Sequence, residues 1–329
     1  MNTKNKILTG LFSMVALFSS CSDFQEINED PNQVDESKVK PEWFLNASIV
    51  GDQMNPEIAE RMFILTWNRA SRFNRGSGFT IGTDNNDYIT RYLSNDYAVK
   101  WLNQATKAVQ LGEKKVADGE ADLYPYYKNV IQMARIWRAY LNSEVSDGFG
   151  PIPALDAFSG APGEYDSVEA IYTFILKELK EAEAALDPSI DMSPMSAEDA
   201  FYAGNVNMWK KYANSLRMRL AMRIVNANPQ LAEREFEDAA SKGYISSLSE
   251  LAGVQEKDGW SDLTSVMSRT WNAQAMSVTF KNLVVGLGSN EFPLPDSLKA
   301  HLKNPHTYMG LYLDRHFPLT TNDPCAGFY

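Results

Sequence analysis

The sequence predicts a mainly α protein with a tetratricopeptide-like fold, a right-handed superhelix of paired helices interrupted by long irregular loops. Apolar residues recur three or four positions apart along segments after residue 41, as on one face of an α-helix. Alternation of apolar and polar residues, the pattern of a half-buried strand, is almost absent. Two long segments, 73–96 and 244–272, lack periodicity and are rich in Gly, Ser, Asn and Asp. Amphipathic helices with short connections stack in antiparallel pairs, so the superhelix is expected without a strict sequence repeat.

The first 20 residues read as a lipoprotein signal peptide. Lys4 and Lys6 form a basic start, an apolar run follows over 7–18, and Ser19–Ser20 are the small residues expected at a cleavage site. The run is shorter than the roughly 20 residues that span a bilayer as a helix. Small residues directly before Cys21 favour lipidation of that cysteine as the new N-terminus. An ordinary secretory signal with an incidental cysteine is the alternative.

Residues 21–40 form an acidic linker after the lipidated cysteine, and the α-helical domain is expected over 41–329. The chain carries a formal net charge of −11 at pH 7, and loss of the signal peptide removes only basic charges. Nucleic acid and anionic lipid are negatively charged, so an acidic chain is not expected to bind either of them. The two cysteines are Cys21 and Cys325, so lipidation of the first leaves the second without an internal partner.

The helices follow in order along the domain. Periodicity predicts helices at 43–50, 57–72 and 97–117. A longer one follows within 122–143, and its stripe comprises Leu123, Tyr127, Val130, Ala134, Trp137 and Leu141. After this helix, the sequence predicts a rigid, extended segment, which we interpret as a structural turn. The residues that predict it are Gly148, Gly150, Pro151 and Pro153.

The next helix starts near Asp166, an expected N-cap with Glu169 three residues on, and ends before Pro188. Its stripe comprises Val168, Ile171, Ile175, Leu179, Ala182 and Leu186. Another runs from 207 until Pro229 stops it, with Trp209, Tyr212, Ala213, Leu216, Leu220 and Ile224 as its stripe. Helices at 230–241 and 273–286 complete the set.

Charged residues on the later helices have simple expected roles. The basic side chains of Arg217, Arg219 and Arg223 are expected to face acidic neighbours or helix C-termini. The acidic side chains of Glu233, Glu235, Glu237 and Asp238 are expected to form a solvated helix face.

Three blocks resemble one family. "EVSDGFGPIPALDAF", "YDSVEAIYTFILKELKEAEAAL" and "MWKKYANSLRMRLAMRIVNANP" occur in the order and spacing of SusD/RagB-type lipoproteins, and "FQEINEDPN" resembles the start of the same group. The resemblance implies a surface-exposed, nutrient-binding lipoprotein that caps a SusC-like, TonB-dependent outer-membrane transporter and delivers oligosaccharides to it. Family members are longer, so we expect that the C-terminal part is missing, in a shortened product or a fragment.

The acidic residues after Cys21 also resemble a surface-export signal. Asp23, Glu26, Glu29 and Asp30 resemble the signal that sends lipoproteins of Bacteroidetes to the outer leaflet. A solvated linker is the alternative, and both can hold together.

No constellation for catalysis stands out, so we expect a non-enzyme without cofactor or metal. G-x-S-x-G, P-loop and H-E-x-x-H signatures are absent. His301, His306 and His316 have no spacing that would place two of them one helical turn apart. "TDNND" at 83–87 offers oxygen ligands but lacks the spacing of a known calcium loop, so a turn is favoured.

Glycan binding requires exposed rings and polar side chains, because sugars present apolar faces and hydroxyl edges. Candidates lie in and beside the two irregular segments, and burial in the core is the alternative for each ring. The candidates are Trp67, Asn68, Arg72, Tyr88, Trp101, Trp260 and Trp271. Trp260 is the best of them, since Asp258, Gly259, Ser261 and Asp262 flank it.

Three alternatives to a glycan-binding lipoprotein remain open from the sequence. The same fold can bind oligopeptides, the chain can be a surface glycoside hydrolase, or it can be a non-binding remnant. The ranking rests on family analogy more than on an identified site.

Overall fold

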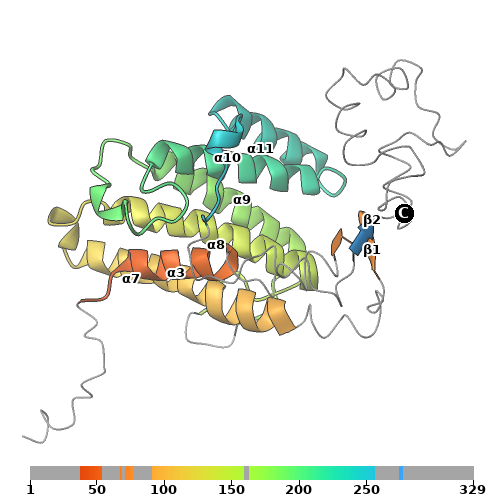
Figure 1. Cartoon of the computed structure of the whole chain (residues 1–329), viewed down its shortest axis with the longest axis horizontal. Helices are drawn as coiled ribbons and strands as arrows, with labels where there is room; N and C mark the ends of the chain where they lie inside the picture. Colours follow the sequence, from red (N-terminus) through yellow and green to blue (C-terminus); the bar gives the residue numbers. More distant parts are fainter. Residues whose placement is uncertain are drawn as a thin grey trace, which may run out of the picture. The chain divides into compact units, whose positions relative to one another are not determined.

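The computed structural model describes residues 38–53, 67–68, 71–76, 91–158, 163–255 and 274–276 (Figure 1). Contacts divide the chain into residues 1–40 and 41–329, and every helix and strand below belongs to the second unit. The predicted signal peptide, Cys21 and most of the acidic linker lie outside the described residues.

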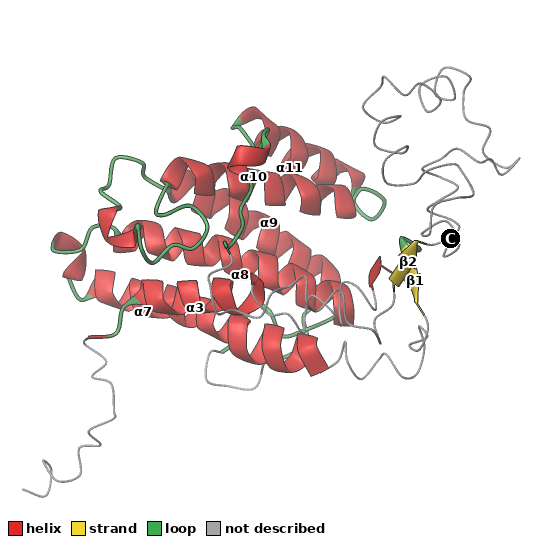
Figure 2. Ribbon diagram, in the orientation of Figure 1, coloured by secondary structure: helices red, strands yellow, loops and turns green. Residues whose placement is uncertain are grey.

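Helices dominate the described residues, as Figure 2 shows, which confirms the predicted mainly α class. The α-helices are α3 (Pro41–Gln53), α7 (Asn103–Ala117), α8 (Tyr127–Phe149), α9 (Val168–Ala185), α10 (Val206–Arg223) and α11 (Pro229–Ser241). A π-helix, η4 (Tyr92–Leu102), leads directly into α7. Short 3₁₀ turns are η5 (Glu120–Asp122), η6 (Ser193–Met195) and η7 (Leu248–Glu250), and the strands are β1 (Asn74–Gly76) and β2 (Gln274–Met276).

Each long helix packs on the next one along the chain. α7 contacts α8, α8 contacts α9, α9 contacts α10, and α10 contacts α11, while α3 and η4 pack against both α7 and α8 (Figure 1). Stacking of sequence neighbours in this way is the arrangement of helical-repeat proteins.

The predicted apolar stripes form the core of this stack. Tyr127, Val130, Ala134, Trp137 and Leu141 of α8 are all buried, as are most members of the α9 and α10 stripes. The exposed members precede a helix or begin one: Leu123 is 77% exposed before α8, and Val168 is 40% exposed at the first position of α9. Tyr212 and Ile224 of the α10 stripe are half-buried against the core. A stripe therefore predicts burial best away from the ends of the helix that carries it.

Buried hydrogen bonds fix the registers of α3, η4 and α8. Trp137 Nε1 donates to Ser48 Oγ at 2.8 Å, and the Ser48 hydroxyl donates to the Trp101 carbonyl at 2.8 Å. Ser48 thus links three helices. It also provides the hydrogen-bond acceptor that the buried Trp137 N–H requires.

Two expected helix boundaries were wrong. The N-cap of α9 is Ser167, whose hydroxyl accepts from the Ala170 amide at 3.1 Å, and not Asp166. Pro229 does not stop α10, which ends at Arg223; it is the first residue of α11, capped by Asn228. Proline suits that first position because the position needs no N–H donor.

The acidic face of α11 was expected to be solvated, and this was wrong for Glu235, which is buried. Its partner is an arginine of α10. Arg217 is fully buried, with its guanidinium against the buried carboxylate of Glu235 and 2.6 Å from Asp238. The expectation that these arginines face acidic partners is confirmed, since Arg223 lies 2.8 Å from Asp147 and Arg219 lies 3.8 Å from Glu144.

The segment predicted as a helix at 273–286 begins differently. Gln274–Met276 is strand β2, antiparallel to β1, with Arg75 opposite Ala275; the remainder lies outside the described residues. The helix predicted at 57–72 is described only at its end, where Phe73 N donates to Asn68 O at 2.8 Å around Arg72, whose φ is +59°. A 6→1 bond around a left-handed residue is a common helix terminus.

Candidate functional site

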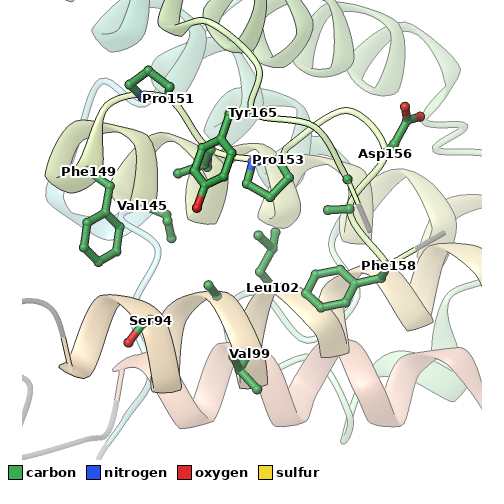
Figure 3. A pocket seen from close by; sticks show the side chains of 14 residues that line it. Ser94, Val99, Leu102, Val145, Phe149, Pro151, Pro153, Asp156, Phe158 and Tyr165 are labelled. Atoms are coloured by element: carbon green, nitrogen blue, oxygen red, sulfur yellow. The ribbon is translucent and has the colours of Figure 1, made fainter. Parts of the chain in front are cut away.

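A pocket lies between η4, the end of α8 and the loop that leads to α9 (Figure 3). Its volume is about 590 Å³, within the range of small-molecule sites. Its lining residues are Ser94, Ala98, Val99, Leu102, Val145, Phe149, Pro151, Ile152, Pro153, Asp156, Ala157, Phe158, Gly163 and Tyr165. We call it the η4 pocket.

The walls of the η4 pocket are almost entirely apolar and carry exposed rings. Phe149 is 40% exposed, Phe158 38% and Tyr165 77%. In Figure 3, Phe149 and Phe158 stand at opposite sides of the view, and the Tyr165 hydroxyl points into the space between them. Exposed rings of this kind are platforms for stacking, because apolar sugar faces and planar groups both pack on them.

Few polar atoms face the pocket. The carboxylate of Asp156 points away from the other labelled side chains in Figure 3. The Ser94 hydroxyl lies 3.4 Å from the Arg91 carbonyl of its own helix. Tyr165 therefore supplies the principal polar group of the pocket.

Rigid backbone geometry holds the loop that forms one wall. Gly150 ends α8 with φ +82°, which a side chain rarely adopts, and Pro151 and Pro153 fix their own φ angles. Asp166 then ties the loop to the start of α9: its amide donates to the Ile152 carbonyl at 3.0 Å.

The Asp166 carboxylate completes this attachment. Its Oδ2 accepts from the amides of Ala154 and Leu155, both at 2.9 Å. The residue that the sequence suggested as a helix cap thus caps the pocket loop instead. These hydrogen bonds hold the backbone of residues 152–155, so this part of the loop is expected to keep its shape without a ligand.

Phe158 has a backbone conformation that aromatic residues rarely adopt. Its φ is +63°, and its carbonyl lies 3.4 Å from Gln110 Nε2 of α7. Left-handed backbone at a residue other than glycine costs about 1 kcal/mol or more and concentrates at functional sites. Here it accompanies a ring that lines the pocket.

The opposite wall is η4, which is seated on α8 by a close approach. A Cβ built on Gly148 would lie 2.2 Å from Leu93 Cδ1, so glycine at this position leaves room for the buried Leu93 side chain of η4. π-helical turns are rare and frequently occur at functional sites. The lining residues Ser94, Ala98 and Leu102 recur every four positions along this helix.

Asp52, Tyr97 and Glu144 form a largely buried polar cluster. Tyr97 and Glu144 directly precede the pocket-lining residues Ala98 and Val145 in the sequence. Burial raises the pKa of Asp52 to about 7, opposed by hydrogen bonds from Gln53 and Tyr97 and reinforced by the nearby Glu144 carboxylate. Burial also raises the pKa of Glu144. Asp52 therefore exchanges its proton near neutral pH.

The sequence-predicted site residues do not gather at this pocket. Trp101 is only 4% exposed and packs edge-on against Tyr97, with ring centroids 4.7 Å apart, so it is a core residue and offers no free face. Trp67 is half-buried against the core, Asn68 is half-buried, and Arg72 is exposed. Tyr88, Trp260 and Trp271 lie outside the described residues.

Sequence reasoning missed the η4 pocket. Its loop was in view as "GFGPIPALDAF", but the glycines and prolines were interpreted only as a turn. The available signal was the presence of Phe149, Phe158 and Tyr165 off any helical stripe in a proline-braced loop. The η4 wall gave no local signal, because its partner lies some 50 residues away along the chain.

Within the described ranges, no group of three or more His, Cys, Asp or Glu side chains is placed to hold a metal ion. Among the same residues, no helix combines the length and the apolar character needed to cross a membrane.

The fold and the pocket define a class, a helical-repeat protein with an aromatic-lined pocket at its surface. The chain belongs to the SusD-like family, described as Susd and RagB outer membrane lipoprotein, which it matches over residues 26–292. The resemblance drawn from the sequence is thereby confirmed. No curated protein sequence matches the chain.

Solved structures share its tetratricopeptide-like fold. A chitin-binding protein is 20% identical, with a TM-score of 0.64 over 77% of this chain and 54% of its own. A SusD homolog from Parabacteroides distasonis is 23% identical, with a TM-score of 0.58 over 72% and 46%. A chitin-binding SusD homolog from Flavobacterium johnsoniae is 22% identical, with a TM-score of 0.56 over 77% and 55%. The chain spans about half the length of these structures.

Proposed function

We propose that this protein is a surface-exposed, lipid-anchored glycan-binding protein that captures oligosaccharides and delivers them to a TonB-dependent outer-membrane transporter without cleaving them. Membership of the SusD-like family of outer membrane lipoproteins carries the proposal. Similarity to two chitin-binding proteins of the same fold supports a carbohydrate as the cargo. The η4 pocket adds exposed rings on which a sugar can stack.

Capture and delivery require only modest affinity. Stacking on a few rings at an open pocket leaves much of a ligand in water, so we expect a Kd in the micromolar range or weaker. Isothermal titration against a polysaccharide and oligosaccharide panel tests this point. A nanomolar Kd for an unbranched oligosaccharide would contradict it.

The anchor is proposed at Cys21, after cleavage of residues 1–20. Mass spectrometry of protein isolated from outer membranes should find an acylated N-terminal cysteine. Retention of the leader, or an unmodified thiol at residue 21, would remove this part of the proposal. Protease accessibility on whole cells then tests whether the domain faces outward.

The transporter is proposed from the family alone. A pull-down from solubilised outer membranes should recover a TonB-dependent porin with this protein. Failure to recover one under conditions that retain other outer-membrane complexes would count against delivery while leaving glycan capture open.

One observation favours a second cargo, oligopeptides. The η4 pocket has apolar walls and few hydrogen-bonding groups, and apolar side chains suit such walls better than bare sugars do. Titration with a peptide pool alongside the glycan panel separates the two. Release of reducing ends by the purified protein would instead support a glycoside hydrolase.

A further inference from the structure

We infer that the η4 pocket selects glycans that carry an aromatic substituent, and that it holds this apolar ring rather than a bare sugar. The inference rests on the proposed function, because it names the substrate class for the same site. It assigns the apolar ring to the pocket floor and the attached sugar to the pocket mouth.

The walls of the η4 pocket match an aromatic ring better than a sugar ring. A sugar ring directs several hydroxyl groups outward, and each loses free energy if it is buried without a partner. The η4 pocket offers walls such as Leu102, Val145 and Ile152, and few polar atoms. A phenyl group has no hydroxyl group that would lose its hydrogen bonds on burial. Contact of the ring with each apolar wall is favourable in free energy.

The Tyr165 hydroxyl is placed to donate a hydrogen bond to a ligand in the pocket. Figure 3 shows the Tyr165 hydroxyl pointing into the pocket, among carbon atoms. No residue in the described ranges forms a hydrogen bond with it. A linking oxygen between an aromatic group and a sugar presents one acceptor beside a flat ring, which is what this arrangement can bind.

The volume of the η4 pocket suits a phenyl ring with an attached sugar. An enclosed apolar cavity of about 150 Å³ is large enough to hold benzene. The η4 pocket has about 590 Å³, so a phenyl ring leaves room for the first attached sugar at the mouth. Phe149 and Phe158 border this space with half-exposed rings, and such rings pair with another aromatic group edge-to-face or offset.

The test compares matched ligands by isothermal titration with the purified protein. Benzyl and methyl β-glycosides of cellobiose, xylobiose and N,N′-diacetylchitobiose differ only in the aromatic ring. We expect at least one benzyl glycoside to bind about tenfold more tightly than its methyl partner, because the ring loses apolar area to the pocket. Benzyl alcohol serves as the ligand without sugar.

Two variants locate the effect. Val99 is 59% exposed and lines the pocket, so Val99→Asp adds a charge to an apolar wall without disturbing the core. This variant should lose the benzyl advantage while its affinity for the methyl glycoside stays within about twofold, since a bound aromatic ring would cover the carboxylate and remove its water. Tyr165→Phe should reduce the advantage in part. Tyr244→Ala removes a half-exposed ring that does not line the pocket, and it should change nothing.

The outcomes separate this inference from the proposed function. Equal affinity for benzyl and methyl glycosides, or a benzyl advantage that survives Val99→Asp, overturns the inference and leaves glycan capture standing. Binding of benzyl alcohol alone, with no sugar contribution, overturns the proposed function. Absence of binding by every ligand overturns both. Circular dichroism confirms that each variant is folded.

Discussion

Arg217 is among the largest side chains that the described core buries completely, and it is charged. Its guanidinium donates to the carboxylates of Glu235 and Asp238, so the charge is neutralised within α10 and α11. Formation of an ion pair in the interior requires the desolvation of both charged groups. Loss of one partner leaves the other charge buried without compensation. The pair therefore joins α10 to α11 more specifically than apolar contact alone.

The first prediction concerns this pair. Arg217→Met should lower the free energy of unfolding by about 3–5 kcal/mol, because it leaves the Glu235 carboxylate buried without its cation. Urea denaturation measures the change. Arg234→Met is the matched control: Arg234 contacts the same carboxylate at 3.3 Å but is 66% exposed, so its loss should cost below about 1 kcal/mol. Equal effects of the two substitutions would contradict the account.

The second prediction concerns Asp52, whose pKa burial raises from 3.8 to about 7. A carboxyl with a raised folded-state pKa favours folding when protonated, so this contribution is complete below pH 4 and is lost as the pH rises through 7. One pKa unit corresponds to about 1.4 kcal/mol, so the loss approaches about 4 kcal/mol. Asp52→Asn should remove this pH dependence and raise stability at pH 8.

Chemical denaturation from pH 4 to pH 8 follows this change. Glu113→Gln, at an exposed position of α7, provides the control and should leave the pH profile as it is. A profile for Asp52→Asn that matches the unmodified protein would show that Asp52 does not titrate in this range.

At the scale of elements, η4 and α8 meet where Gly148 leaves no room for a side chain. Gly148→Ala places a Cβ 2.2 Å from Leu93 Cδ1 if nothing moves, so the buried Leu93 side chain of η4 must change its position. Overpacking of this kind costs about 1–3 kcal/mol. Gly253→Ala, at a site with no atom within 4 Å, should be nearly neutral. Thermal unfolding of the two variants provides the comparison.

The loop that forms the other wall depends on Asp166. Asp166→Ala removes the acceptor for the Ala154 and Leu155 amides, so hydrogen exchange at those two amides should accelerate. Ser167→Ala should cost about 1 kcal/mol through loss of the α9 cap, without faster exchange in the loop. If both variants exchanged alike at these amides, the division of roles between the two neighbours would be wrong.

Local periodicity predicted the helices well, because burial of Val130, Ala134 and Trp137 depends on spacing within one helix. It failed where the partner lies elsewhere in the chain. Glu235 belonged to an acidic run and was expected in solvent, but Arg217 draws it into the interior. Asp166 could not be told from Ser167 as a cap, since the loop amides that it binds lie 11 and 12 residues before it.

The pocket was beyond prediction for the same reason. η4 and the loop before α9 lie far apart in the chain, and neither segment alone indicates a cavity. Trp101 illustrates the converse: a tryptophan next to an irregular segment looked available, yet the packing of η4 against α3 and α8 buries it. Exposure of an aromatic ring is a property of the tertiary fold. The sequence therefore indicates which aromatic residues are candidates for ligand binding, and the packing decides which of them are exposed.

At the scale of the whole molecule, a stack of helices provides a rigid support, and the candidate binding surface is formed by η4, the end of α8 and the connection to α9. This division suits the proposed capture of ligand, because a rigid support can hold the pocket open before ligand arrives. Pre-organisation of this kind reduces the entropy that binding costs.

The most direct test of glycan capture is isothermal titration of the purified protein against a panel of oligosaccharides and a pool of peptides. The account predicts saturable binding of at least one oligosaccharide with a micromolar or weaker Kd, weakened several-fold by Tyr165→Ala and unchanged by Leu248→Ala outside the pocket. Binding of peptides with no response to any oligosaccharide would contradict it.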